Sequence, residues 1–159
     1  MCTSVNQSAV VTLREVTIDN SSEILKLRVS TAQQEYVASN ERSIAAAHLH
    51  EEAWFRAIYA DETPVGFLML HDENLRQQVR QDDYYFLWRL MVDERFQGLG
   101  FGRKAVQLLV EHVRQRPNAT ALLVSYHPGP DGPGGFYSKL GFVETGKQVG
   151  DEVEMRFVL

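Results

Sequence analysis

The sequence predicts a single α/β domain built around a mixed β-sheet, and three observations support this fold class. The 159 residues are close to the roughly 150 of an average domain. Hydrophobic residues make up 44% and charged residues 23% of the chain, a balance typical of a globular protein rather than a disordered or fibrous one. Segments with strand periodicity alternate with segments with helix periodicity, as in a sheet covered by helices.

The first third of the chain predicts one strand followed by helices. Residues 10–18 (VVTLREVTI) are rich in β-favouring residues and roughly alternate, so they are expected to form the first strand. Residues 19–21 offer N-caps for a helix that follows. Residues 30–52 are expected to be helical in two pieces with a break near Ser39 and Asn40. The second piece is rich in alanine, the strongest helix former.

A β-hairpin and a loop are expected next. Residues 57–60 and 65–71 are hydrophobic and predict two strands, joined by residues 61–64 (DETP), a good turn sequence. Residues 72–83 are polar and charged, so they predict a loop or a frayed helix.

The centre of the chain predicts a strand, a turn, a helix and a second strand. Residues 84–92 (YYFLWRLMV) form the most hydrophobic segment and are expected to be a central strand. A glycine-rich turn occupies residues 93–102, and residues 104–114 then place apolar side chains on one helical face. Ala121–Tyr126 is a short apolar strand, expected to run parallel to the central one because a helix connects them.

The C-terminal segment predicts a loop, a short helix and a hairpin. Residues 127–135 (HPGPDGPGG) are rich in proline and glycine, and residues 136–140 read as a helix that ends at Gly141. The chain is expected to close with two strands, residues 142–145 and 152–159, joined by a turn over residues 146–150.

The distribution of charge limits the partners. The formal net charge of −5 argues against a general nucleic-acid binder, because phosphate backbones need a positive surface. Residues 1–83 hold 13 acidic and 7 basic side chains, whereas residues 84–159 hold 8 and 9. The acidic half is expected to form much of the surface offered to a cationic ligand.

Simple counts set the expectations for compartment, membrane and metal. Cys2 is the only cysteine, so we expect no disulfide framework and no cysteine-based metal site, and the five histidines lack a metal-ligand pattern. No apolar run approaches the roughly 18 residues of a membrane span. The start of the chain (MCTSVNQSAV) lacks the pattern of a secretory signal. We therefore expect a cytoplasmic protein without a metal, in which residues 1–9 are flexible and residues 10–159 form the domain.

A glycine-rich loop after the central strand is the strongest functional signal. Gly98, Gly100 and Gly102 alternate with other residues where a buried strand ends and a helix begins. Such spacing lets backbone N–H groups turn inward, and the helix adds the positive end of its dipole. Three cations lie beside the loop: Arg95, Arg103 and Lys104. The loop predicts a phosphate or pyrophosphate site, and the alternative is a sharp turn that needs glycine for its geometry alone.

Two nucleotide-binding motifs do not match this loop. The dinucleotide motif G-x-G-x-x-G lies early in its domain, but here Arg103 stands in place of the third glycine and roughly 90 residues precede the loop. The P-loop motif requires Ser or Thr after its lysine, and Lys104 is followed by Ala105.

The loop and a second motif together resemble the GNAT superfamily of acetyl-coenzyme A-dependent N-acetyltransferases. The family signature Arg/Gln-x-x-Gly-x-Gly/Ala is met by residues 97–102 (QGLGFG), and the later Tyr-x-x-x-Gly-Phe element by residues 137–142 (YSKLGF). The resemblance covers nearly the whole chain. It implies a splayed, mixed and mostly antiparallel sheet of about six or seven strands flanked by about four helices. Within the superfamily, the chain is most similar to bacterial spermine/spermidine acetyltransferase-type proteins.

The resemblance also implies where acetyl-coenzyme A binds as the cosubstrate. The pyrophosphate would sit on the glycine loop, and the pantetheine arm would pair with the preceding strand like an added β-strand. The parallel strands must separate there, and a β-bulge in residues 84–92 is the expected cause. The implied cofactor-binding residues are Leu90, Met91, Val92, Gln97, Gly98, Leu99, Gly100, Phe101, Gly102, Arg103 and Lys104.

The resemblance implies a general acid but leaves the base open. Tyr137 matches the family's general-acid position, and a phenol with an ordinary pKa of about 10 keeps its proton at neutral pH. By position alone, Tyr137 could instead be a core or surface tyrosine beside Phe136. Related polyamine enzymes carry acids where this chain has Trp88 and Arg89, so Glu35 or a water chain is left as the base.

The implied acceptor is a primary amine, either a polyamine or another small cationic amine. Glu35 and Tyr36 are the expected substrate-binding residues. An amino acid, a drug amine and a protein amine are alternative acceptors, and a module that binds acetyl-coenzyme A without turnover is an alternative function. We expect no nucleic-acid or membrane partner. Because dimers are frequent in the family, a homodimer is one expected assembly.

Overall fold

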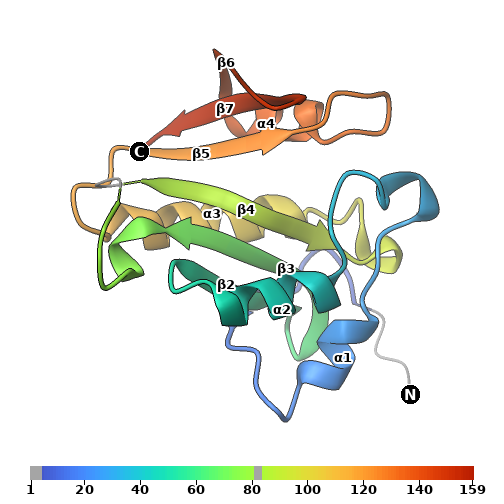
Figure 1. Ribbon diagram of the computed structural model, residues 1–159. Coiled ribbons are helices and arrows are strands. Elements are labelled where there is room, and N and C mark those ends of the chain that lie inside the picture. Colours follow the sequence, from blue (N-terminus) through green and yellow to red (C-terminus); the bar gives the residue numbers. More distant parts are fainter. Residues whose placement is uncertain (1–4, 81–83) are drawn as a thin grey trace.

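The described residues form one mixed sheet of seven strands in the order β1-β2-β3-β4-β5-β7-β6 (Figure 1). This computed structural model describes residues 5–80 and 84–159. Neighbouring strands are antiparallel except β4 and β5, which are parallel. The strands are β1 (Val11–Arg14), β2 (Ala53–Ala60), β3 (Thr63–Asp72), β4 (Tyr85–Val92), β5 (Ala121–Tyr126), β6 (Val143–Val149) and β7 (Glu152–Val158).

Helices cover both faces of this sheet. The α-helices are α1 (Ser21–Lys26), α2 (Asn40–Leu49), α3 (Phe101–Arg114) and α4 (Gly134–Leu140), and the 3-10 turns are η1 (Thr31–Gln33), η2 (Glu73–Leu75) and η3 (Glu94–Phe96). The predicted α/β class is confirmed, and so is the predicted order of strands and helices apart from the helix expected over residues 30–38.

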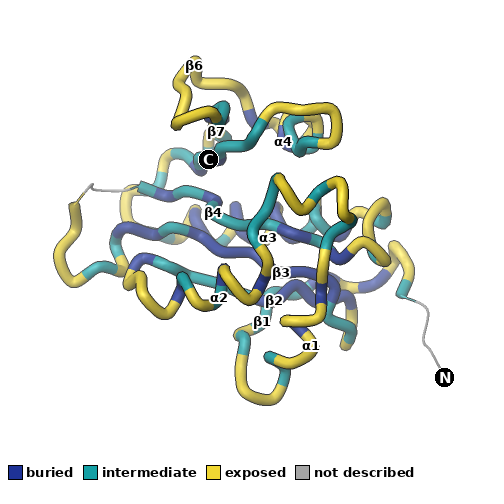
Figure 2. Tube along the Cα trace, turned by 45° about the vertical axis from the view of Figure 1, so that its right-hand side comes forward, coloured by how far each residue is buried: buried dark blue, intermediate teal, exposed yellow. Residues whose placement is uncertain are grey.

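Two hydrophobic clusters hold the helices against the sheet. On one face, Leu109 of α3 packs in a cluster with Leu68 of β3. On the other face, Ile24 of α1 packs in a cluster with Phe67. Phe67 and Leu68 point to opposite faces because successive side chains of a strand alternate. Figure 2 shows that buried residues run along the middle strands, whereas exposed residues lie on the outer helix faces, the loops and the edge strand β6.

The two parallel strands pair only near the start of β4. The paired residues are Phe86 with Leu123 and Leu87 with Val124. Beyond these pairs β4 continues to Val92 and β5 to Tyr126 without pairing to each other. The sheet is therefore splayed at its centre, as the resemblance implies.

A β-bulge lies at the point of separation. Leu87 of β4 faces Leu70 of β3, whereas the next register pair is Arg89 with Met69. Trp88 is thus the extra residue on β4, and it has no register partner on β3. Because a bulge bends and twists its strand, it turns the rest of β4 away from β5. The predicted bulge is confirmed.

Several predicted boundaries were wrong. The first strand ends at Arg14, because the chain leaves the sheet edge there to reach α1. β2 begins at Ala53, four residues earlier than predicted, since its first half also pairs with β3. In the last hairpin, Gly146 (φ 85°) lies at a register shift inside β6 and not in the turn, so β6 extends to Val149.

The helix predicted over residues 30–38 does not form, which is a further correction. The segment contains only η1, and α2 begins after Ser39, whose side chain accepts a hydrogen bond from the Arg42 N–H (3.2 Å). Just before the segment, the Glu94 N–H donates to the Arg28 carbonyl (3.0 Å). Such contacts with the loop after β4 outweigh the local preference for helix.

Candidate active site

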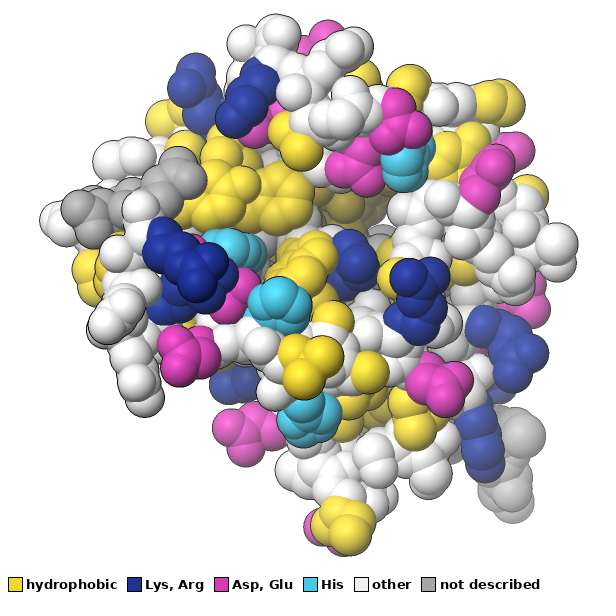
Figure 3. All heavy atoms as spheres, in the orientation of Figure 1, with side chains coloured by type: hydrophobic (Ala, Val, Ile, Leu, Met, Phe, Trp, Pro, Cys, Tyr) yellow, Lys and Arg dark blue, Asp and Glu magenta, His cyan; other side chains and the backbone are white. Residues whose placement is uncertain are grey.

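A cleft of about 970 Å³ opens where β4 and β5 separate. The second half of β4 forms one wall, and the N-terminus of α3, the end of β5 and α4 form the others. The segment between α1 and α2 lines the cleft from the opposite side. Figure 3 shows the molecule hollowed below the β5–β7 layer, with hydrophobic side chains inside the hollow and Lys or Arg side chains near its edge.

The glycine loop forms one end of this cleft. Gly98 (φ 78°) and Gly100 (φ 83°) are in the left-handed region, which side chains other than glycine rarely adopt. Gly100 is also the N-cap of α3, and no side chain caps this helix end. The first N–H groups of α3 are therefore available to an anion, with the helix dipole behind them. Gly102 lies inside α3, so its role is not conformational.

Asp93 anchors the loop to the rest of the fold. Its buried carboxylate accepts hydrogen bonds from the backbone N–H of Arg28 (3.0 Å) and from both the N–H (3.0 Å) and the Nε (2.8 Å) of Arg95. Burial alone would raise the pKa of Asp93, but these hydrogen bonds outweigh it and lower the pKa. The Arg95 side chain is therefore bound to Asp93 and stabilises the loop.

The implied cofactor-binding residues divide into two groups. Most of them line the cleft: Leu90, Met91, Val92, Gln97, Gly98, Gly100, Phe101, Gly102 and Arg103. Leu99 and Lys104 do not line it. Leu99 packs against the hydrophobic core, and the Lys104 ammonium donates to the Gln7 carbonyl (2.8 Å).

Gln97 has a second role besides lining the cleft. Its amide nitrogen donates to the Val92 carbonyl (2.8 Å) and to the Gln33 side chain (2.9 Å), which donates back (3.2 Å). The glycine loop is thereby joined to the segment between α1 and α2. This contact therefore links two segments that both line the cleft.

The first nine residues lie only partly within the described residues. Residues 1–4 lie outside the described residues, and Gln7 contacts Lys104 as above. The flexibility of residues 1–9, the domain bounds 10–159 and a homodimer stay predictions.

Tyr137 lies at the boundary between the hydrophobic core and the cleft. Its side chain is buried (6% exposed), and its ring meets Phe136 and Phe142 edge to face at centroid distances of 5.3 and 5.4 Å. The residue also lines the cleft, opposite β4. Burial raises the pKa of the Tyr137 phenol well above its ordinary value, so the hydroxyl keeps its proton. The two interpretations that the sequence left open, core residue and proton donor, are compatible.

Glu35 and Tyr36 lie on the other side of the cleft. Both line it, and Glu35 is exposed. The Tyr36 hydroxyl lies against the Pro/Gly-rich loop after β5, because a Cβ added to Gly129 would be 2.2 Å from the Tyr36 oxygen. Gly132 lies against the same ring, at 3.2 Å for an added Cβ. The two loops therefore meet beside the cleft.

Sequence reasoning did not select several polar residues of this cleft. Arg89 and Arg42 line it on the β4 and α2 sides. Glu152 of β7 accepts a hydrogen bond from the Ser125 hydroxyl and lies 3.3 Å from the Nε2 of His127. The expected bulge in residues 84–92 was the signal that could have drawn attention to Arg89.

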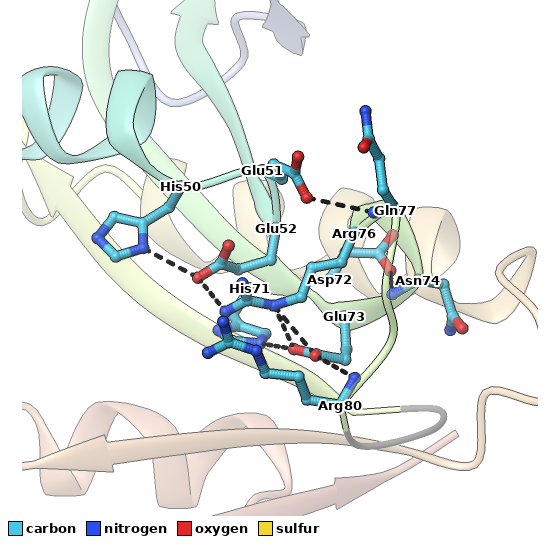
Figure 4. A network of polar contacts seen from close by, with 10 residues as sticks. All are labelled: His50, Glu51, Glu52, His71, Asp72, Glu73, Asn74, Arg76, Gln77 and Arg80. Carbon is cyan, nitrogen blue, oxygen red and sulfur yellow. Dashed lines mark hydrogen bonds and ion pairs between the residues drawn. The ribbon is translucent and has the colours of Figure 1, made fainter.

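A network of ion pairs links the start of β2 to the end of β3 and to η2 (Figure 4). Arg76 pairs with Glu52 (2.7 Å) and Glu73 (3.0 Å), and the Glu73 carboxylate also lies 2.7 Å from the His71 Nε2. Burial alone would raise the pKa of Glu73. Hydrogen bonds from the Arg80 N–H, His71 and Arg76 outweigh it and lower the pKa to about 2.

Neither metal ligands nor a membrane span is found in the part of the chain that the structure describes. Within residues 5–80 and 84–159, no three His, Cys, Asp or Glu side chains are grouped so that they could hold a metal ion. No helix in these ranges is long and apolar enough to cross a bilayer.

Comparisons with known proteins agree with this geometry. A sequence model of the Acetyltransferase (GNAT) family matches residues 21–142. The spermine/spermidine N(1)-acetyltransferase of Bacillus subtilis (strain 168) is 26% identical over 140 residues, which cover 86% of this chain and 90% of that protein.

Solved structures share the fold at low identity. An aminoglycoside acetyltransferase, AAC(6')-Ib in complex with coenzyme A, superposes with a TM-score of 0.72 at 18% identity, covering 94% of this chain and 95% of its own. The PaiA N-acetyltransferase of Thermoplasma acidophilum, also in complex with coenzyme A, gives 0.68 at 15% identity, covering 94% and 99%.

Proposed function

The chain belongs to the GNAT acetyltransferase family and is an acetyl-coenzyme A-dependent N-acetyltransferase, and on that premise we propose that its acceptor is the primary amine of a small cationic molecule. The observation that carries the proposal is the cleft between β4 and β5, which is lined both by the anion cradle and by acidic side chains. These acids are Glu35, Asp131 and Glu152.

The residues of the cleft fit the cosubstrate. The left-handed Gly98 and Gly100 and the uncapped N-terminus of α3 supply N–H donors for a pyrophosphate. From there, the edge of β4 over residues 90–92 is free of pairing to β5, so it can pair with an extended pantetheine arm. An acetyl group at the end of that arm would lie near the bulge at Trp88, across the cleft from Tyr137.

The chemistry needs positioning, one proton donor and one proton acceptor. Bound acetyl-coenzyme A supplies the activated acetyl group as a thioester. A backbone N–H of β4 near the bulge stabilises the carbonyl oxygen on which negative charge develops. Tyr137 donates a hydrogen bond to the departing sulfur, and Glu35 or a water chain removes the proton from the attacking amine. Holding the amine against the thioester removes much of the entropic barrier.

Two observations support the acceptor class: the acidic side chains of the cleft and the similarity to a polyamine acetyltransferase. The relative from Bacillus subtilis is named for spermine and spermidine, which are small polycations. The acids of the cleft attract such an amine. Acetyl transfer to an amino acid, a drug amine or a protein amine uses the same cofactor geometry and differs only in the acceptor end.

An amine panel tests this function. We expect the protein with acetyl-coenzyme A to release free thiol at a rate that depends on the concentration of a small cationic amine. Binding of the coenzyme without thiol release from any amine would contradict turnover and favour a regulatory binding module. Release with protein amines alone would contradict the proposed acceptor class.

A glutamate in the anion cradle should abolish coenzyme binding. Gly100→Glu places a carboxylate and a side chain at the left-handed N-cap of α3, where it repels a pyrophosphate. Isothermal titration calorimetry with acetyl-coenzyme A should show a loss of affinity of about 100-fold or more. The matched control is Gly146→Glu, which has the same left-handed backbone (φ 85°) in β6, outside the cleft. Equal affinity for Gly100→Glu and the wild type would mean that the loop is only a turn.

A further inference from the structure

Arg89 occupies the acceptor end of the cleft. It follows the bulge on β4, where β4 has separated from β5, and its side chain lines the cleft. Its register partner Met69 belongs to the cluster on the α1 and α2 side of the sheet, so Arg89 points to the side from which Glu35 and Tyr36 line the cleft.

The position of Arg89 separates it from the pyrophosphate cradle. Val92, the end of β4, lies three positions beyond Arg89, about 10 Å along the extended strand. The glycine loop begins only beyond η3. A coenzyme that follows β4 from the loop towards the bulge reaches Arg89 with its acetyl end and not with its phosphates.

The Arg89 guanidinium lacks an anionic partner among the described residues. Its Nη1 donates to the Trp88 carbonyl (3.0 Å), but its Nε is buried without a hydrogen-bond partner in residues 5–80 and 84–159. No carboxylate in these ranges lies within ion-pair distance of it. Buried donors are nearly always hydrogen-bonded, so an unsatisfied one in a binding cleft indicates a group that a ligand completes.

Two charged groups act on Arg89 in opposite senses, the Glu152 carboxylate more strongly than the Arg42 guanidinium. Burial lowers the pKa of Arg89, Glu152 opposes this effect and the Arg42 charge adds to it. Glu152 is itself engaged with the Ser125 hydroxyl and His127. Arg42, which also lines the cleft, contributes a second positive charge on the same side.

We infer that Arg89, assisted by Arg42, binds a carboxylate of the acceptor, so that among small cationic amines the enzyme favours diamino acids over the diamines that lack a carboxylate. The planar guanidinium presents paired N–H donors that match the two oxygens of a carboxylate. Glu35 and Glu152 would then attract the amino groups of the same molecule. This inference rests on the proposed function and names the acceptor class within it.

Matched pairs of acceptors test the inference directly. Ornithine and putrescine, and likewise lysine and cadaverine, differ only in the carboxylate. We expect kcat/KM from thiol release to be at least about 10-fold higher for the diamino acid of each pair. Arg89→Gln should lower kcat/KM for the diamino acid about 10- to 100-fold, mainly through KM, and leave that for the diamine within about threefold.

Further variants separate recognition from folding. Arg89→Lys keeps the charge but loses the fork of donors, so its effect on the diamino acid should be intermediate. The control Arg114→Gln makes the same exchange on an exposed ion pair of α3 and should change neither acceptor. Unchanged affinity for acetyl-coenzyme A and an unchanged melting temperature would show that Arg89→Gln is folded.

The outcomes distinguish this inference from the proposed function. Turnover of diamines with no gain from a carboxylate, or an equal loss for both acceptors in Arg89→Gln, would overturn the role of Arg89 and leave the proposed function standing. No thiol release with any amine would overturn both.

Discussion

Tyr137 combines a buried ring with a position at the cleft, and this combination determines what its hydroxyl can do. Burial raises the pKa of the phenol above its ordinary value of about 10, whereas an ordinary thiol has a pKa of about 8.5. Complete proton transfer to a thiolate is therefore uphill. Tyr137 can still stabilise the negative charge that develops on sulfur by donating a short hydrogen bond as the bond to sulfur breaks.

Removing this hydroxyl should impair turnover and little else. Tyr137→Phe keeps the aromatic contacts with Phe136 and Phe142, so we expect kcat to fall about 100-fold while KM for both substrates changes little. Steady-state kinetics of thiol release measures both constants. Because the pKa of Tyr137 is raised, its ionisation should cause no loss of kcat below about pH 10.

A second tyrosine provides the control for this substitution. Tyr59 is also 6% exposed, but it lies outside the cleft and its hydroxyl accepts from the Asn20 side chain (3.1 Å). Tyr59→Phe should leave kcat unchanged. Wild-type kcat in Tyr137→Phe would remove Tyr137 from the mechanism.

At the scale of elements, two loops enclose the acceptor end of the cleft. The segment before α2 contributes Tyr36, and the loop between β5 and α4 contributes Gly129 and Gly132, which lie against its ring. Glycine is required at residue 129 because the Tyr36 hydroxyl occupies the place of a side chain. The many glycines of residues 127–135 thus allow a close approach of two distant segments.

Adding one methyl group should separate these loops. In Gly129→Ala the new Cβ would lie 2.2 Å from the Tyr36 oxygen, so one loop must move. We expect KM for the acceptor to rise about fivefold or more, with KM for acetyl-coenzyme A unchanged. Gly135→Ala is the matched control, since nothing lies within 4 Å of its added Cβ. An unchanged acceptor KM in Gly129→Ala would show that the contact does not shape the acceptor site.

At the scale of the whole molecule, part of the N-terminal acidity is used inside the fold. Glu52 and Glu73 are buried and pair with Arg76, and Asp72 is buried and pairs with Arg116 (2.6 Å). These carboxylates hold the β2–β3 hairpin to its surroundings and are not offered to a ligand. The net charge of residues 1–83 therefore overstates the negative surface that an acceptor meets.

The ion-pair network should make stability depend on pH. The pKa of Glu73 is lowered to about 2, so its ionised form stabilises the folded state; this contribution is complete above about pH 5 and is lost as the pH falls towards 2. Glu73→Gln should lower the free energy of unfolding by about 2 kcal/mol at neutral pH. The difference from the wild type should shrink steadily below about pH 5.

Urea unfolding at neutral pH and at about pH 3 measures this difference. The control is Glu62→Gln, which breaks an exposed ion pair with Arg14 and should change stability very little. A loss in Glu73→Gln of the same size at both pH values would contradict a role for the carboxylate charge.

Local signals in the sequence were sufficient for the order of elements and for the anion cradle. A hydrophobic strand, left-handed glycines and an amphipathic helix follow each other directly, and neighbouring residues determine each of these features. The bulge and the separation of β4 from β5, which the family resemblance implied, were also correct. The helix expected over residues 30–38 was wrong, because contacts with the loop after β4 override its local preference.

The sequence by itself therefore determined the fold class, the family and the loop that fits a pyrophosphate. Only the tertiary structure decided which charged side chains remain free for a ligand. Lys104, adjacent to the cradle in sequence, donates to Gln7, whereas Arg89 is left in the cleft without an anionic partner among the described residues. The reason is physical: backbone conformation is set largely by near neighbours, but the partner of a charge is set by segments that meet only when the chain folds.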